Sequence, residues 1–206
     1  MTPEVVAALS RPRTVVLLVG PSGYGKSRLA ADVARRLDGA VVVAYGGLPD
    51  TPYAALRELV AALPADPGVA GEVEAALLAA DTGDLRCYLL CRAVRRALVA
   101  ATVVLDDVDR ADAASQRVLR CVLSRLPHGT RLLLTATAGR GAPLGEGWHP
   151  TWRFDLAPLS VAEIHALAPG RSRRWARTVH ADTGGVPRWV SAVLARGGPE
   201  PAVPAT

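Results

Sequence analysis

Short apolar runs rich in valine and leucine occur at intervals along the chain and predict buried β-strands. Four such runs span residues 15–19, 40–44, 102–105 and 131–135, and a fifth strand of more mixed composition is expected at 152–156. Runs of this length fit strands better than helices, which need ten residues or more. Because the first four runs have no polar face, we expect a sheet that is covered on both sides.

Helical patterns lie between the predicted strands. In residues 27–37, Leu29, Val33 and Leu37 recur every four residues and share one helix face. Further helices are expected at 52–63, 69–80, 85–100 and 113–126, the last capped by Asp112. Strands that alternate with helices are typical of parallel sheets. The predicted fold class is therefore α/β: a parallel five-stranded sheet with helices on both faces, over residues 1–157.

The pattern changes after Pro158, where no further strand is expected. Ser160 and Glu163 have the spacing of a capping box that opens a helix, and two more helical stretches follow at 172–182 and 187–195. We expect residues 158–196 to form a small C-terminal helical lid. Residues 197–206, GGPEPAVPAT, are rich in glycine, proline and alanine and are expected to be disordered.

A glycine-rich loop follows the first predicted strand and opens the first helix. Residues 20–27 form GPSGYGKS, which matches the phosphate-binding pattern GxxxxGK[ST] at each fixed position. Backbone N–H groups of such a loop point toward phosphates, Lys26 supplies a point charge, and the Ser27 hydroxyl is a ligand for Mg²⁺. The loop residues expected to bind a nucleotide are Gly20, Pro21, Ser22, Gly23, Tyr24, Gly25, Lys26, Ser27 and Arg28.

Acidic residues follow the third predicted strand. Asp106 and Asp107 come directly after the apolar run of residues 102–105, at the edge of the sheet where α/β proteins bind ligands. Asp106 fits the carboxylate that holds Mg²⁺, and Asp107 fits a general base or a group that orients water. Asp107 and Lys26 are the two predicted catalytic residues.

The fourth predicted strand ends in polar residues that allow two interpretations. Thr135 or Thr137 could contact a terminal phosphate or the attacking water, and Arg140 could sense charge. The alternative is a strand end with threonines of high β propensity and a surface arginine. We include Thr135 among the predicted nucleotide-binding residues.

Composition narrows the functional classes. The chain has 206 residues and 50% hydrophobic side chains, enough for a core, and no apolar run long enough to cross a membrane. Three cysteines do not make a disulfide framework, so we expect a cytoplasmic protein. The net charge is +5, and the mild excess is tilted toward the C-terminus, where RSRRWAR at 171–177 is the densest run. We interpret this run as a solvated helix face rather than a nucleic-acid patch, and we do not expect direct DNA binding. Lys26 is the single lysine of the sequence, which favours a chemical role for it.

Five segments together resemble a known family. They are GPSGYGKSRLA, VVLDDVDRAD, RLLLTATAGR, FDLAPLSVAEI and ADTGGVPRWV, in this order over about residues 14–195. The combination resembles the ATPase module of STAND-type signalling ATPases, AAA-like P-loop NTPases, and most of all the ATP-binding LuxR-type transcriptional regulators of actinobacteria. The resemblance implies that the chain binds ATP or ADP with Mg²⁺, that Pro187 packs toward the base, and that the ATP form self-associates or binds a protein partner.

The sequence also departs from that family. No Gly-Arg pair precedes the first strand, Val186 replaces the asparagine of the family's GNP motif, and residues 1–206 contain no stretch expected to form a sensor or DNA-binding module. The function expected from the residues and the resemblance is slow, Mg²⁺-dependent ATP hydrolysis as a regulatory switch. Three alternatives stay open: an ATPase acting on nucleic acid, a phosphotransferase for a small acceptor, and a module that binds nucleotide without turnover.

Overall fold

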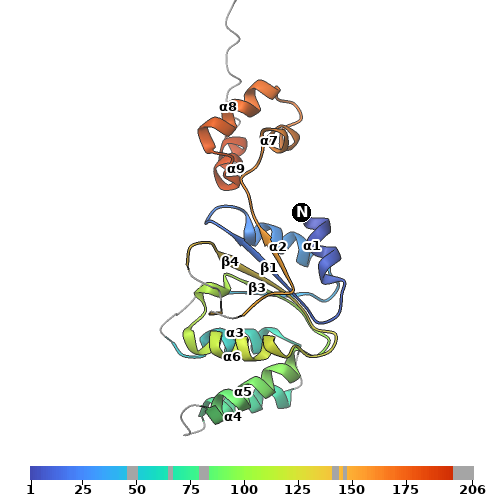
Figure 1. The fold of residues 1–206 in the computed structure, drawn as a ribbon, viewed down its shortest axis with the longest axis vertical. Helices are drawn as coiled ribbons and strands as arrows, with labels where there is room; N and C mark the ends of the chain where they lie inside the picture. The colour runs from blue at the N-terminus through green and yellow to red at the C-terminus, as the bar shows by residue number, and fades with distance from the viewer. Residues whose placement is uncertain (46–50, 65–66, 79–83, 141–143, 146–147, 197–206) are drawn as a thin grey trace, which may run out of the picture.

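The computed structural model describes residues 1–45, 51–64, 67–78, 84–140, 144–145 and 148–196 (Figure 1). Its strands are β1 (Thr14–Gly20), β2 (Val41–Ala44), β3 (Thr102–Asp106), β4 (Arg131–Thr137) and β5 (Trp152–Asp155). Its helices are α1 (Thr2–Leu9), α2 (Lys26–Ala34), α3 (Ala54–Ala62), α4 (Pro67–Leu78), α5 (Asp84–Ala97), the short 3₁₀ helix η1 (Val108–Arg110), α6 (Ala113–Ser124), α7 (Val161–Leu167), α8 (Arg173–Thr183) and α9 (Pro187–Ala195).

The five strands form one parallel sheet in the order β2-β3-β4-β1-β5. The predicted α/β fold with a five-stranded parallel sheet is therefore confirmed. Strand β1 lies between β4 and β5, and all seven of its residues are buried. Because the strands are parallel, β1, β3 and β4 all end at the same edge of the sheet, which brings Gly20, Asp106 and Thr137 to that edge.

Alternate residues of the strands pack on opposite faces of the sheet. In β1, Val15, Leu17 and Val19 join the core that is shared with α3, α5 and α6, whereas Val16 and Leu18 join the core formed with α1 and α2. Successive side chains of a strand point to opposite faces, so an uninterrupted apolar run has partners on both. Strands β1, β3 and β4 thus bury both of their faces, as expected from their apolar runs. The edge strand β2 does not, because Val42 on one of its faces is 52% exposed.

Helix α1 was not expected from the sequence. The helix covers the sheet beside α2, and its residues Val5 and Leu9 are completely buried between the helix and the sheet. These two residues are four apart, and Pro3 lies in the first turn, where proline is favoured. The spacing of Val5 and Leu9 is visible in the sequence, but a pattern of only two helical turns does not by itself predict a helix. The sheet surface that buries these residues is known only from the structure.

Local signals placed several helix starts correctly. The Asp112 carboxylate caps α6 by accepting a hydrogen bond from the Ser115 N–H at 2.8 Å. The capping box of α7 is also present: the Ser160 hydroxyl accepts from the Glu163 N–H at 3.2 Å, and Glu163 accepts from the Ser160 N–H at 2.8 Å. Strand β4 continues two residues beyond its expected end, to Thr137.

Helices α7, α8 and α9 form a small bundle beyond the carboxyl edge of the sheet (Figure 1). The bundle has its own core, in which Ile164, Trp175, Ala176, Val179 and Val190 are buried. We refer to these three helices as the lid. The predicted disordered tail, residues 197–206, lies outside the described residues. Within the described ranges, the helices are too short or too polar for any of them to cross a membrane.

Candidate active site

A cavity of about 410 Å³ lies at the carboxyl edge of the sheet, below the lid. It is bounded by the glycine loop after β1, the segments after β3 and β4, and the start of α9. Eight of the predicted site residues line it: Ser22, Gly23, Gly25, Lys26, Ser27, Arg28, Asp107 and Pro187. The other five do not: Gly20, Pro21, Tyr24, Asp106 and Thr135.

The glycine loop takes a backbone conformation that only glycine adopts easily. Gly23 and Gly25 have φ angles of 85° and 82°, and Gly25 is the N-cap of α2. A side chain at either position would be strained. With this turn, the first residues of α2, Lys26, Ser27 and Arg28, reach the cavity. The unpaired N–H groups of a helix N-terminus carry partial positive charge, so the cavity wall is suited to phosphate.

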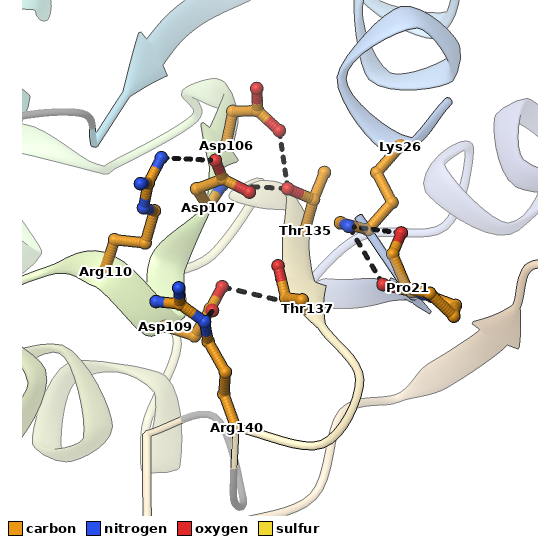
Figure 2. Close-up of polar contacts among 10 residues, drawn as sticks. Pro21, Lys26, Asp106, Asp107, Asp109, Arg110, Thr135, Thr137 and Arg140 are labelled. Atoms are coloured by element: carbon orange, nitrogen blue, oxygen red, sulfur yellow. Dashed lines mark hydrogen bonds and ion pairs between the residues drawn. The ribbon is translucent and has the colours of Figure 1, made fainter. Parts of the chain in front are cut away.

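The Lys26 side chain is held inside the glycine loop. Its ammonium donates hydrogen bonds to the backbone carbonyls of Gly20, at 2.9 Å, and Pro21, at 3.1 Å (Figure 2). The residue is only 6% exposed. An ammonium group has three N–H donors, so one donor is left for an anion in the cavity that Lys26 lines. Gly20 and Pro21 therefore contribute by holding the lysine rather than by lining the cavity.

Thr135 links the two acids at the end of β3, Asp106 and Asp107. Its hydroxyl donates to Asp106 Oδ1 at 2.5 Å and accepts a hydrogen bond from the Asp107 N–H at 2.8 Å (Figure 2). Thr135 is fully buried, and its hydroxyl has used its single proton. The structure therefore places Thr135 behind the acids, while Thr137, two residues further on, lines the cavity.

The backbone turns sharply at Asp107. Its φ of 55° lies in the left-handed region, and the residue opens η1. Aspartate tolerates this conformation better than most residues. The turn brings the carboxylate to the cavity wall, 3.5 Å from the guanidinium of Arg110.

A third acid, Asp109, supports the end of β4. Asp109 Oδ1 accepts a hydrogen bond from the Thr137 N–H at 3.1 Å, and its Oδ2 lies 3.9 Å from Arg140 Nε (Figure 2). The Asp109 side chain is only 6% exposed. Asp109 thus holds both the strand end and Arg140, which lines the cavity. The pairing of Arg140 with Asp109 could not be read from the sequence, where they are 31 positions apart.

The lid is bonded to the glycine loop. The Arg188 N–H, in the first turn of α9, donates to the Gly23 carbonyl at 3.0 Å, and Pro187, Arg188 and Ser191 line the cavity. The turn before α9 needs glycine at 185, since a Cβ there would lie 2.3 Å from the Leu159 carbonyl oxygen. Arg188 and Ser191 were missed by the sequence analysis, although both follow Pro187, which was included.

Two oxygen ligands of the site are suited to Mg²⁺, namely the Ser27 hydroxyl and the Asp106 carboxylate. The described residues contain no cluster of three or more His, Cys, Asp or Glu side chains able to hold a metal by themselves. Mg²⁺ needs no such cluster, because it takes most of its ligands from water and substrate phosphates and only one or two from the protein. The Ser27 hydroxyl at the cavity and the Asp106 carboxylate, fixed by Thr135, are donors of the right type. The residues present therefore fit a magnesium–nucleotide complex.

Residues 4–135 match the family model of the AAA ATPase domain. The chain belongs to the AAA ATPase domain family. The match includes the glycine loop, Asp106 and Asp107 at the end of β3, and Thr135, so these residues lie within a domain of ATPase type. No curated protein sequence matches the chain.

Several solved structures share the fold. A Signal Transduction ATPase with Numerous Domains (STAND) protein with a tetratricopeptide repeat sensor, from Pyrococcus horikoshii, matches with a TM-score of 0.62 and 17% identity over 98% of this chain and 30% of that protein. A RuvB mutant from Thermotoga maritima matches at 0.55 and 17%, over 94% of this chain and 61% of RuvB. A Walker-type ATPase from Pyrococcus abyssi matches at 0.57 and 13%, over 95% and 67%.

These similarities support the P-loop ATPase module predicted from the sequence. At such low identities they concern the fold alone, and the chain spans less than a third of the STAND protein. The specific resemblance to LuxR-type regulators stays a prediction.

Proposed function

We propose that this AAA ATPase domain binds ATP with Mg²⁺, hydrolyses it slowly, and acts as a nucleotide switch within or beside a transcriptional regulator. The observation that carries the proposal is the bond between the lid and the glycine loop, from the Arg188 N–H to the Gly23 carbonyl. Residues of both parts line one cavity, so a change at the phosphates acts on the lid directly. A switch needs such differential contacts in its two states.

The residues of the chain have distinct proposed roles in binding. Lys26 donates its remaining N–H to a phosphate oxygen, and the N–H groups at the start of α2 bind the others. Ser27 and Asp106 hold Mg²⁺, which when bound neutralises charge on the phosphates. Arg28, Arg140 and Arg188 line the same cavity and add positive charge. Pro187 is proposed to pack toward the base.

Asp107 is the proposed base for hydrolysis. Asp107 lines the cavity, and its backbone N–H donates a hydrogen bond to the Thr135 hydroxyl. This bond fixes the position of the backbone from which the carboxylate extends. A carboxylate in this position can orient a water molecule and accept its proton. Arg110, which forms an ion pair with Asp107, holds the carboxylate on the side facing the cavity. We propose that turnover by the chain alone is slow. Fast hydrolysis would need an additional positive charge at the phosphates, supplied by a second subunit or a protein partner.

The test measures binding and turnover in the same samples. Mg²⁺-dependent binding of ATP and GTP is measured by calorimetry, and phosphate release is followed over hours, for the natural chain, Lys26→Ala and Asp107→Asn. Arg173→Gln, an exposed change on α8 away from the cavity lining, is the control. We expect ATP-selective binding that falls at least 100-fold in Lys26→Ala, and hydrolysis lost with binding kept in Asp107→Asn.

Other results would point to the alternatives. Tight ATP binding with no phosphate release in any sample would make the chain a binding module. Equal turnover in Asp107→Asn would remove that residue from the chemistry. Absence of binding by the natural, folded chain would contradict the whole proposal.

A nucleic-acid function is a second candidate, favoured by one observation. Arg173, Arg174 and Arg177 are exposed on α8 and form no ion pair with any described residue. Three neighbouring arginines on one helix are suited to contact phosphates of a nucleic acid. DNA binding that weakens steeply with salt, changes with ATP and is lost on substituting these arginines would favour it over the switch.

A further inference from the structure

A second hollow lies between α5 and α6, away from the nucleotide cavity. It has a volume of about 360 Å³ and is lined by residues of both helices and of the segment after α6. Helix α5 lies at the opposite end of the molecule from the lid (Figure 1), and the two hollows share no lining residue. We call it the α5–α6 groove. It is large enough for a small organic ligand, since such pockets begin at about 300 Å³.

The groove is strongly positive. Arg92, Arg95, Arg96 and Arg125 line it, and none of the acidic residues that the structure describes does. Arg96 forms an ion pair with Glu72, and Arg95 donates to the Cys121 carbonyl at 2.7 Å.

Two of these arginines are not engaged. The side chains of Arg92 and Arg125 are exposed and have no hydrogen bond or ion pair with any residue that the structure describes. They come from different segments that border the groove: Arg92 belongs to α5, and Arg125 follows α6 directly. Elsewhere on the molecule exposed charges are often paired, as Arg57 is with Glu74 and Arg153 with Asp155. Two free guanidinium groups facing one hollow are suited to a carboxylate, because each can donate in a forked geometry.

The walls between the arginines are apolar. Tyr88 is 61% exposed and Val99 is 59% exposed, two of the large apolar side chains left open to solvent, and Pro127 closes the same hollow. Burial raises the pKa of the Cys91 thiol, which also lines the groove, so this group is neutral and does not repel an anion. Apolar area rimmed by charge is typical of a binding surface rather than of ordinary protein surface.

We propose that the α5–α6 groove binds a small amphipathic anion, a carboxylate with an apolar body, at a site separate from the nucleotide. The charge is complementary to a carboxylate, and the apolar walls suit a hydrocarbon body rather than a bare phosphate or a nucleic-acid backbone. The small volume favours a ligand over a partner protein, which would need a far larger surface.

The test uses decanoate as the probe, with two matched ligands. Acetate has the charge without the apolar body, and 1-decanol has the apolar body without the charge. We expect calorimetry on the full chain to show saturable binding of decanoate, at least tenfold tighter than of either control. Binding of decanoate no tighter than 1-decanol, or no binding, would overturn the proposal.

Substitutions locate the site. Arg92→Gln with Arg125→Gln should weaken decanoate binding at least tenfold, as loss of charged hydrogen bonds does. The matched control, Arg13→Gln with Arg36→Gln, removes two exposed arginines that do not line the groove and should bind decanoate normally. Equal affinities for the two double variants would contradict the assignment.

A single change guards against loss of folding. Val99→Asp alters an exposed side chain at the groove and should also weaken decanoate binding, with an unchanged circular dichroism spectrum. Mg²⁺–ATP affinity should stay constant in all these variants, which separates failure here from failure of the proposed function. A dimer that decanoate does not affect and that Val99→Asp dissociates would instead identify the groove as a contact between copies of the chain.

Discussion

The sheet domain and the lid contribute to one cavity but differ greatly in how much core holds each together. The sheet packs two large clusters of buried residues, one on each face, whereas the lid has five buried residues in three short helices. A small core supplies little free energy, and regions with few buried contacts open at low cost. The part of the site that is built on α9 is therefore the part that can move, while the glycine loop and the acids are fixed to the sheet.

The first prediction compares the effect of a large-to-small substitution in the lid core with that of one in the sheet core. Trp175→Ala, in the lid core, should cost about 3–5 kcal/mol, and Leu134→Ala, in β4, about 2–5 kcal/mol. Because the lid core is small, Trp175→Ala should unfold the lid and leave the sheet intact. Hydrogen exchange would show lost protection in α7–α9 only, whereas Leu134→Ala should lower protection throughout the sheet. Global unfolding in both variants would mean that the two parts are one cooperative unit.

The second prediction concerns the turn that joins α8 to α9. Gly185→Ala places a Cβ 2.3 Å from the Leu159 carbonyl oxygen at a φ of 70°. Relief of this contact must displace the start of α9, at a cost of about 2–4 kcal/mol. We expect weaker ATP binding in calorimetry with little change in the thermal unfolding of the sheet. Gly170→Ala, in a lid position where nothing lies within 4 Å of the added Cβ, is the control and should bind ATP normally.

The third prediction concerns Asp112, which connects the starts of α3 and α6 by hydrogen bonds. Asp112 caps α6 and also accepts hydrogen bonds from the Tyr53 and Ala55 N–H groups at 2.9 and 3.2 Å, at the start of α3. Asp112→Ala leaves buried donors of two helices unpaired and should cost about 2–3 kcal/mol. Denaturant unfolding measures this loss. A cost equal to that of an ordinary single cap would show that the bonds to α3 contribute nothing.

The same residue predicts a dependence on pH. Burial alone would raise the pKa of Asp112, but hydrogen bonds from Ser115, Tyr53 and Ala55 outweigh it, and the pKa lies below its usual range. A carboxyl whose pKa is lower in the folded state stabilises the protein above its unfolded pKa of about 3.9. This contribution is lost as the pH falls through the folded-state pKa. Acid unfolding of Asp112→Ala should therefore lack that part of the pH dependence.

The smallest effect is expected at the first lid helix. Ser160→Ala removes a capping box that is exposed to solvent and should cost about 1 kcal/mol, confined to the lid. Hydrogen exchange of α7 should rise with no change in the sheet. Ser160→Asp, which keeps a cap acceptor, should restore protection. A change of equal size in sheet protection would contradict the independence of the two regions.

Much of the fold and part of the site could be predicted from local sequence. The apolar runs of β1 and β3 specify buried strands, GPSGYGKS specifies the turn before α2, and capping residues mark the starts of α6 and α7. Each of these signals depends on neighbours a few residues away, so it survives without the tertiary structure. Lys26 and Asp107 could be proposed in this way, because strand ends of a parallel sheet share one edge.

Only the tertiary structure decided which side chains meet. Thr135 lies 29 positions from Asp106, yet the register of β3 beside β4 makes its hydroxyl a support for both acids rather than a wall of the cavity. The bond from Arg188 to Gly23 and the groove between α5 and α6 likewise join segments far apart in the chain. The physical reason is that local propensities set the elements, whereas contacts across the sheet and the lid depend on strand order and helix packing, which no short segment encodes alone.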